Sequence, residues 1–199
     1  MKTRFNLSAL GFALLGFVAV STATADETKT SPSRDALKGL QPFIGQWTGE
    51  SEAFGGFEGL EDAEQKGNIQ WLLHFRWLQN KAAVEFSSHL TYKKTGERYN
   101  KGSKIMALDA GTGKIGVFGY GYDGDLYFSN TGTMKSKGKS VTLTIDEVSI
   151  NKTKSQYTVT FTKEGPNKIS VHLEELVVDG EKLEGWKRTM QRKPGPAKK

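Results

Sequence analysis

Cysteine is absent from this chain of 199 residues, and histidine, proline and long apolar runs are scarce. Because no disulfide can form, the folded state must be held together by its hydrophobic core. Only three histidines are available for metal binding or for proton transfer near neutral pH. Beyond residue 25, no apolar run is long enough to cross a membrane as a helix. These absences indicate one soluble domain without a transmembrane segment in the mature chain.

Residues 1–25 have the features of a secretory signal peptide. Lys2 and Arg4 make a basic start, an apolar stretch follows over 9–20, and small residues end the segment at Ala25. The apolar stretch is short for a membrane span, although a retained N-terminal anchor is the alternative. We therefore expect export to the periplasm or the extracellular space, with cleavage after Ala25. Loss of this segment lowers the net charge from +6 to +4.

The mature chain is expected to have an irregular segment at each end of one folded domain. Small polar residues predict a flexible segment over 26–36, in which Ser33 is the expected N-cap of a short helix. The folded domain follows over 37–192, and a disordered basic tail ends the chain over 193–199. No recognition motif accompanies the basic tail, and an export signal argues against nucleic acid as a partner.

Alternation of apolar and polar residues dominates the chain from Trp47 to Met190. The clearest run places every second residue on one apolar face: Ile69, Trp71, Leu73, Phe75 and Trp77. Short turns such as Asp123-Gly124 join about ten strands of this kind, so the pattern predicts an all-β antiparallel meander. Closure into an up-and-down barrel removes the exposed edges of so large a sheet. A two-sheet sandwich is the alternative, although it usually has longer connections.

The alternation changes phase at one place. Within 141–150, apolar residues occupy odd positions from Val141 to Ile145 and even positions from Val148 to Ile150. One extra residue in the strand, near Asp146 and Glu147, would account for the change. We therefore predict a β-bulge there.

No arrangement of residues indicates catalysis. The stretch Gly111-Thr112-Gly113-Lys114 lacks the spacing of a phosphate loop and is interpreted as a turn. All three histidines alternate away from the apolar face, where they cannot assist a buried nucleophile: His74, His89 and His172. We therefore predict a protein that is not an enzyme and has no metal centre.

The first strand carries the strongest resemblance to known proteins. Its Phe43-Ile44-Gly45-Gln46-Trp47-Thr48-Gly49 resembles the Gly-x-Trp signature of the calycin barrels, which include the lipocalins. With the strand count and a closing strand that contains Trp186 and Arg188, the chain is similar to secreted bacterial lipocalin-like proteins of unknown function. It is also similar to the nitrobindin-type haem barrels. The resemblance implies that Arg188 lies over Trp47 and closes the barrel; anion binding by Arg188 inside the cavity is the alternative.

The same resemblance provides a candidate cofactor ligand. Nitrobindin-type barrels use a cavity histidine near the end of the chain, and His172 is the nearest candidate here. Its strand alternation places it outside the barrel. A register shift at the pair Glu174-Glu175 would be needed to turn it inward.

The aromatic residues of the apolar face are the candidate lining of a ligand cavity. They are Trp71, Phe75, Trp77, Phe86, Tyr92, Phe118, Tyr157 and Phe161. A glycine-rich stretch with Phe54, Phe57 and Leu60 is the candidate lid. We therefore predict an exported barrel that binds a small hydrophobic molecule and needs no cofactor. Haem binding, and a structural or protein-binding role in the cell envelope, are the alternatives.

Overall fold

The computed structural model describes residues 31–51, 69–123 and 126–194. Two short helices precede the first strand, and a third helical turn connects the second and third strands. In chain order the elements are α1 (Pro32–Ala36), η1 (Lys38–Phe43), β1 (Gly45–Ser51), β2 (Ile69–Leu78), η2 (Gln79–Lys81), β3 (Ala83–Tyr92), β4 (Arg98–Leu108), β5 (Ile115–Asp123), β6 (Leu126–Lys137), β7 (Ser140–Ser149), β8 (Lys154–Gly165), β9 (Lys168–Val178), β10 (Glu181–Lys182) and β11 (Trp186–Arg192). Within these ranges no helix has the length and apolar character that a membrane span requires.

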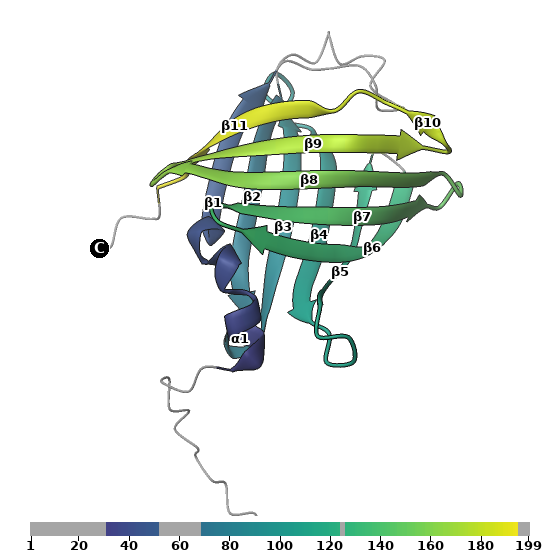
Figure 1. Ribbon diagram of the computed structural model, residues 1–199. Helices are drawn as coiled ribbons and strands as arrows, with labels where there is room; N and C mark the ends of the chain where they lie inside the picture. Colours follow the sequence, from purple (N-terminus) through teal and green to yellow (C-terminus); the bar gives the residue numbers. More distant parts are fainter. Residues whose placement is uncertain (1–30, 52–68, 124–125, 195–199) are drawn as a thin grey trace, which may run out of the picture.

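Ten strands form a closed antiparallel barrel (Figure 1). Each of β1 to β9 pairs with the next strand of the chain, and β9 pairs with β11. The ring closes where β11 pairs with β1, at Trp47 opposite Arg192. The two-residue β10 pairs only with the end of β9. The predicted up-and-down barrel with a short N-terminal helix is thus confirmed.

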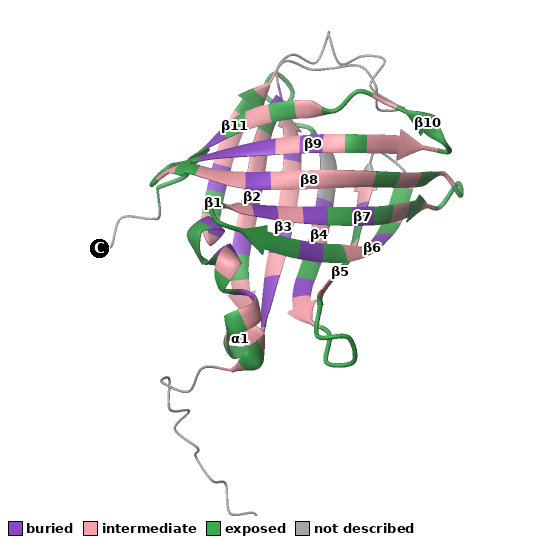
Figure 2. Cartoon of the chain, viewed as in Figure 1, coloured by how far each residue is buried: buried purple, intermediate pink, exposed green. Residues whose placement is uncertain are grey.

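The period-two pattern sets the inner and outer faces of the barrel wall (Figure 2). On β2, Leu73 and Phe75 are buried, whereas the intervening His74 and the exposed Arg76 face outward. Phe75 also contacts Phe86 and Phe161, with ring centroids 4.7 and 5.3 Å away. This phenylalanine cluster fills the middle of the barrel.

The η1 helix closes one end of the barrel. Leu37, Leu40 and Phe43 are at most 1% exposed, and the Phe43 ring lies 6.1 Å from the ring of Phe75. The indole of Trp47 donates a hydrogen bond to the carbonyl oxygen of Phe43 at 2.6 Å, which ties the helix to β1. A buried helix end thereby satisfies one of its orphan carbonyls.

The N-cap of α1 is Ser31, not the predicted Ser33. The Ser31 hydroxyl accepts a hydrogen bond from the amide of Arg34, and Pro32 occupies the first turn. Proline is favoured at this position because the missing N–H would have no partner there. The helix therefore begins within the segment predicted to be flexible.

The predicted bulge near Asp146 and Glu147 is wrong. β7 pairs with β6 and with β8 in continuous register through both residues. The alternation therefore persists, and it turns Val148 outward and leaves it exposed, with Ile150 exposed beyond the strand. Glu147 is partly buried on the inner side instead. A register shift does occur on β9, opposite Tyr157, where Glu175 has a φ of 53°.

Candidate functional site

A cavity of about 90 Å³ lies inside the barrel, on the side of the phenylalanine cluster away from η1. Phe86 and Phe161 belong to both the cluster and the cavity wall, so they form the floor of the cavity. The described residues that line it are Trp71, Leu73, Phe86, Ser88, Lys104, Leu143, Ile145, Tyr157, Val159, Phe161, Val171, Trp186, Arg188 and Met190. Most of this wall is apolar, and it includes two cations.

The cation on β4 is deeply buried. Lys104 is 9% exposed, and it points inward because it alternates with the outward-facing Ile105. Burial lowers the pKa of the Lys104 ammonium below its ordinary value of 10.5, and the negative charge of Glu147 partly offsets this effect. Among the described residues, no carboxylate lies within ion-pair distance of Lys104. A buried ammonium in this situation is costly to the fold.

Gly119 makes the space that Lys104 occupies. The two residues are paired across β4 and β5, and Gly119 is paired in turn with Asn130 on β6. A Cβ atom on Gly119 would lie 2.7 Å from Cγ of Lys104 and 2.4 Å from Oδ1 of Asn130. Any larger residue at 119 would collide with both side chains, so the glycine provides space for each of them.

The pairing register extends this row to a carboxylate. Asn130 is paired with Glu147 on β7, and its Nδ2 donates to the Glu147 carboxylate at 3.2 Å. The Tyr157 hydroxyl donates to the same carboxylate oxygen at 2.9 Å. Burial raises the pKa of the Tyr157 phenol well above 10, with further contributions from the charge and hydrogen bond of Glu147. We call Lys104, Gly119, Asn130 and Glu147 the polar row.

The other cation lies beside two tryptophans. Trp71 and Trp186 pack edge to face with ring centroids 5.0 Å apart, and the Arg188 guanidinium lies 5.8 Å from the Trp186 ring. The Trp71 indole donates to the Ser51 hydroxyl at 2.9 Å. The Trp186 indole N–H is buried and has no acceptor among the described residues. Arg188 lines the cavity, as the alternative of anion binding inside the cavity requires, and anion binding itself stays a prediction.

The cavity contains half of the predicted aromatic lining. Trp71, Phe86, Tyr157 and Phe161 line it. Phe75 and Tyr92 are buried elsewhere in the interior. Trp77 is half-buried, and its indole donates a hydrogen bond to the side chain of Gln41 in η1. These three residues contribute to the barrel core instead of the cavity wall.

Phe118 was predicted to line the cavity, and this is wrong because the side chain is 61% exposed on the outer face. The inner positions of β5 are Val117, Gly119 and Gly121, and the glycine at 119 leaves room for Lys104. Aromatic residues usually mark the inner face of a strand, but on β5 they mark the outer face.

The barrel-closing pair also differs from the prediction. Arg192, not Arg188, lies over Trp47, with its guanidinium carbon 4.2 Å from the ring centroid. It donates to the carbonyl oxygens of Ile44 at 2.7 Å and Pro42 at 3.1 Å. Arg188 shares a face with Arg192, but it lies about 13 Å further along the strand. The prediction chose the right strand and face and the wrong arginine.

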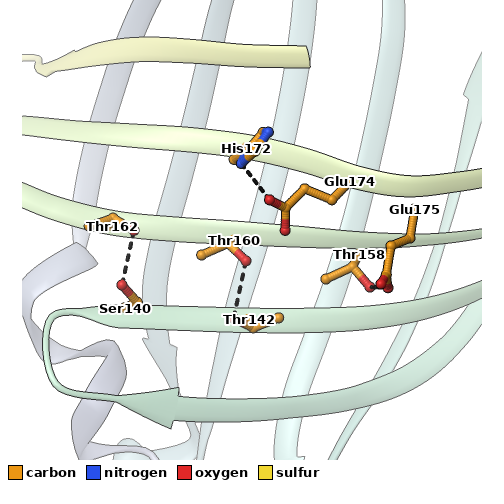
Figure 3. Close-up of polar contacts among 8 residues, drawn as sticks. All are labelled: Ser140, Thr142, Thr158, Thr160, Thr162, His172, Glu174 and Glu175. Carbon is orange, nitrogen blue, oxygen red and sulfur yellow. Dashed lines mark hydrogen bonds and ion pairs between the residues drawn. The ribbon is translucent and has the colours of Figure 1, made fainter. Parts of the chain in front are cut away.

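His172 lies on the outer face of β9, where Figure 3 shows its ring beside Glu174. Its Nδ1 is 2.7 Å from the Glu174 carboxylate, and its side chain is 42% exposed. The neighbours Val171 and Leu173 point inward and are buried. The register shift at Glu175 lies beyond His172 and does not turn it, so the residues of β9 do not fit a haem ligand inside the barrel.

The remaining predicted features lie at or beyond the edges of the described ranges. The candidate lid residues Phe54, Phe57 and Leu60 and the signal peptide over 1–25 fall outside the described residues. Within the described ranges, no cluster of three or more His, Cys, Asp or Glu side chains is arranged to hold a metal ion.

The chain was compared with known proteins. No protein-family model and no curated protein matches it. Eleven chains of solved structures match, among them the crystal structure of Rv2717c from M. tuberculosis. That likeness has a TM-score of 0.54 and 12% identity, and it covers 80% of this chain and 98% of Rv2717c. This likeness supports the closed-barrel fold. At 12% identity it gives no information about the function of this chain.

Sequence reasoning missed Lys104, Asn130 and Glu147. On β4, the apolar Ile105 beside Lys104 is 44% exposed, so hydropathy does not identify the inner face of this strand. On β7, the assumed bulge removed Glu147 from the inner face. Strict alternation, counted without interruption from Ile145, places Glu147 inside. That count was the available signal.

Proposed function

We propose that this protein is an exported, non-enzymatic barrel that binds one small, mainly apolar molecule in its interior cavity. The observation that carries the proposal is the contrast within the barrel interior. One end is filled by η1 and the phenylalanine cluster, whereas the other contains an apolar cavity flanked by two indoles. Interior pockets with apolar walls and a few polar groups are typical of small-molecule sites.

The size of the cavity limits the ligand. A cavity of roughly 150 Å³ holds benzene, with six carbon atoms. By that scale, the 90 Å³ cavity holds about four non-hydrogen atoms without movement of side chains. Long fatty acids and haem exceed this volume severalfold, so short ligands are favoured.

A matched pair of valine substitutions tests the proposal. Val159→Phe adds volume to the cavity wall, whereas Val148→Phe makes the same change on the exposed outer face. The mature protein would be titrated with 1-propanol, acetone and propionate while methyl NMR shifts of Leu143 and Ile145 are recorded. We expect saturable shifts in wild type and Val148→Phe, and their loss in Val159→Phe. If none of the three probes shifts these methyls in wild type, the cavity is not a binding site.

A second candidate role, protein binding in the cell envelope, is favoured by the outer face of β5 and β6. Phe118, Tyr120 and Tyr127 are 61%, 70% and 65% exposed there. Aromatic residues are enriched at protein interfaces, and contiguous exposed apolar surface is uncommon on monomers. Serine substitutions at Phe118 and Tyr120 would weaken co-purification with an envelope partner and would leave ligand binding unchanged.

A further inference from the structure

The charge of the cavity wall is one-sided. Lys104 and Arg188 both line the cavity, and none of the lining residues that the structure describes is a carboxylate. β4 and β11 are four strands apart in the ten-strand ring, so the two cations enter from nearly opposite walls. The carboxylate of Glu147 accepts hydrogen bonds from the neutral donors Asn130 and Tyr157. It does not form an ion pair with Lys104.

Two donors at the cavity, the Lys104 ammonium and the Trp186 indole N–H, lack acceptors among the described residues. Lys104 is 91% buried, and neither a hydrogen bond nor an ion pair of its ammonium exists among the described residues. The indole N–H of Trp186 is buried without an acceptor as well. Asn130 has one buried oxygen without a partner, but it stands behind Gly119 and does not line the cavity. Burying donors without acceptors destabilises a fold, so their retention suggests that a ligand supplies the acceptor.

The apolar part of the wall defines the rest of the ligand. Aliphatic side chains dominate it, including Leu143, Ile145 and Val171. A purely inorganic anion would leave these surfaces without a contact, whereas an alkyl group would cover them. The volume of 90 Å³ admits a chain of only a few carbons.

We infer that the cavity binds a short-chain monocarboxylate of about two or three carbons, with its carboxylate at the Lys104 ammonium and its alkyl group against the aliphatic wall. The inference rests on the proposed function, since it specifies the ligand of the same cavity. A carboxylate is an acceptor with two oxygens, so it can accept from Lys104 and from a second cavity donor at once.

The test compares ligands of the same shape and different charge. Propionate and propionamide would each be titrated into the mature wild-type protein, in buffer free of other carboxylates, with tryptophan fluorescence of Trp71 and Trp186 as readout. We expect propionate to bind at least tenfold more tightly, because charge-assisted hydrogen bonds in a buried site are the stronger ones. A series from acetate to octanoate should lose affinity beyond propionate, and sodium nitrate should bind more weakly than propionate.

A matched pair of variants locates the charge. Lys104→Met keeps the length of the side chain and removes the ammonium, whereas Lys187→Met removes an equal charge from the exposed neighbour of Arg188. We expect propionate affinity to fall at least tenfold in Lys104→Met and to stay within twofold in Lys187→Met. Propionamide affinity should be similar in all three proteins.

Each outcome has a distinct meaning. Equal binding of propionate and propionamide to wild type, or unchanged propionate binding by Lys104→Met, overturns the carboxylate inference and leaves the proposed function in place. Binding of nitrate as tight as that of propionate overturns the alkyl part of the inference. Absence of binding by every probe overturns the proposed function itself. The comparison of the two ligands needs only wild type, so it decides the question even if Lys104→Met does not fold.

Discussion

At the end closed by η1, Trp47 contacts two cations, whereas at the cavity end Trp186 contacts one. Arg192 and Lys163 lie 4.2 and 4.3 Å from the Trp47 ring centroid, and Arg192 also donates to two backbone carbonyls. Arg188 lies 5.8 Å from the Trp186 ring and borders open space, as does Lys104. The same residue types thus stabilise the fold where their polar atoms have protein partners. At the cavity end, the ammonium of Lys104 and the indole N–H of Trp186 have no hydrogen-bond acceptor among the described residues, and both border the candidate site.

The largest expected loss of stability follows substitution at the barrel end that η1 closes. Trp47 is fully buried, and its indole bonds to Phe43, so Trp47→Ala should destabilise the protein by about 3–5 kcal/mol. Trp186→Ala removes a half-buried ring from the edge of an existing cavity and should cost clearly less. Urea unfolding of both variants, followed by circular dichroism, measures the difference. Equal losses would mean that the two ends are packed alike.

The next effect concerns the arginine that closes the barrel. Arg192→Ala should cost about 2 kcal/mol, since it removes cation–π contact with Trp47 and two charge-assisted hydrogen bonds. In double-mutant cycles, Trp47→Ala and Arg192→Ala should couple, whereas Trp47→Ala and Arg188→Ala should be additive. Coupling to Arg188 instead of Arg192 would contradict the observed arrangement.

The buried charge of Lys104 should make the stability of the fold depend on pH. Its pKa is lowered in the folded state, so the unfolded chain holds more protons in the interval between that pKa and 10.5. The cost of the buried charge is therefore complete below the folded pKa and disappears as pH rises to 10.5. Lys104→Met, which lacks this cost, should be more stable than wild type near pH 7, and its advantage should shrink towards pH 10. An advantage that is constant with pH would show that Lys104 is not desolvated.

The smallest effect is expected on the outer face. Phe118→Ser should change stability by no more than about 0.5 kcal/mol, because the side chain is largely exposed. The same substitution at the buried Phe161 should cost several times more. Thermal unfolding of the two variants provides the comparison, and a large loss at Phe118 would place that ring in a contact.

The alternation of apolar and polar residues, together with the short turns, was sufficient to predict the fold. The run from Ile69 to Trp77 faces inward at every second residue, and the short turns between strands left an antiparallel meander as the simplest arrangement. The site required more than hydropathy, because its inner face carries Lys104 and Glu147 while apolar Ile105 and Val148 face outward. A barrel interior tolerates a buried charge where a glycine such as Gly119 makes space for it. Lys104 and Gly119 lie on neighbouring strands, so the sequence of either strand alone does not show that the glycine makes space for the lysine.

The closure of the ring by β1 and β11 has a consequence for the order of folding. All other neighbouring strands of the ring are close in sequence. Trp47 on β1, in contrast, can pair with Arg192 on β11 only after nearly the whole domain has been synthesised. Until then, β1 and β9 present unpaired edges. A contact between positions so far apart in the chain is slow to form, since a long loop must close first. Loss of the last seven residues of the barrel, 186–192, would therefore leave an open sheet with two unpaired edge strands that can associate with other chains. It would also remove Arg188 from the cavity.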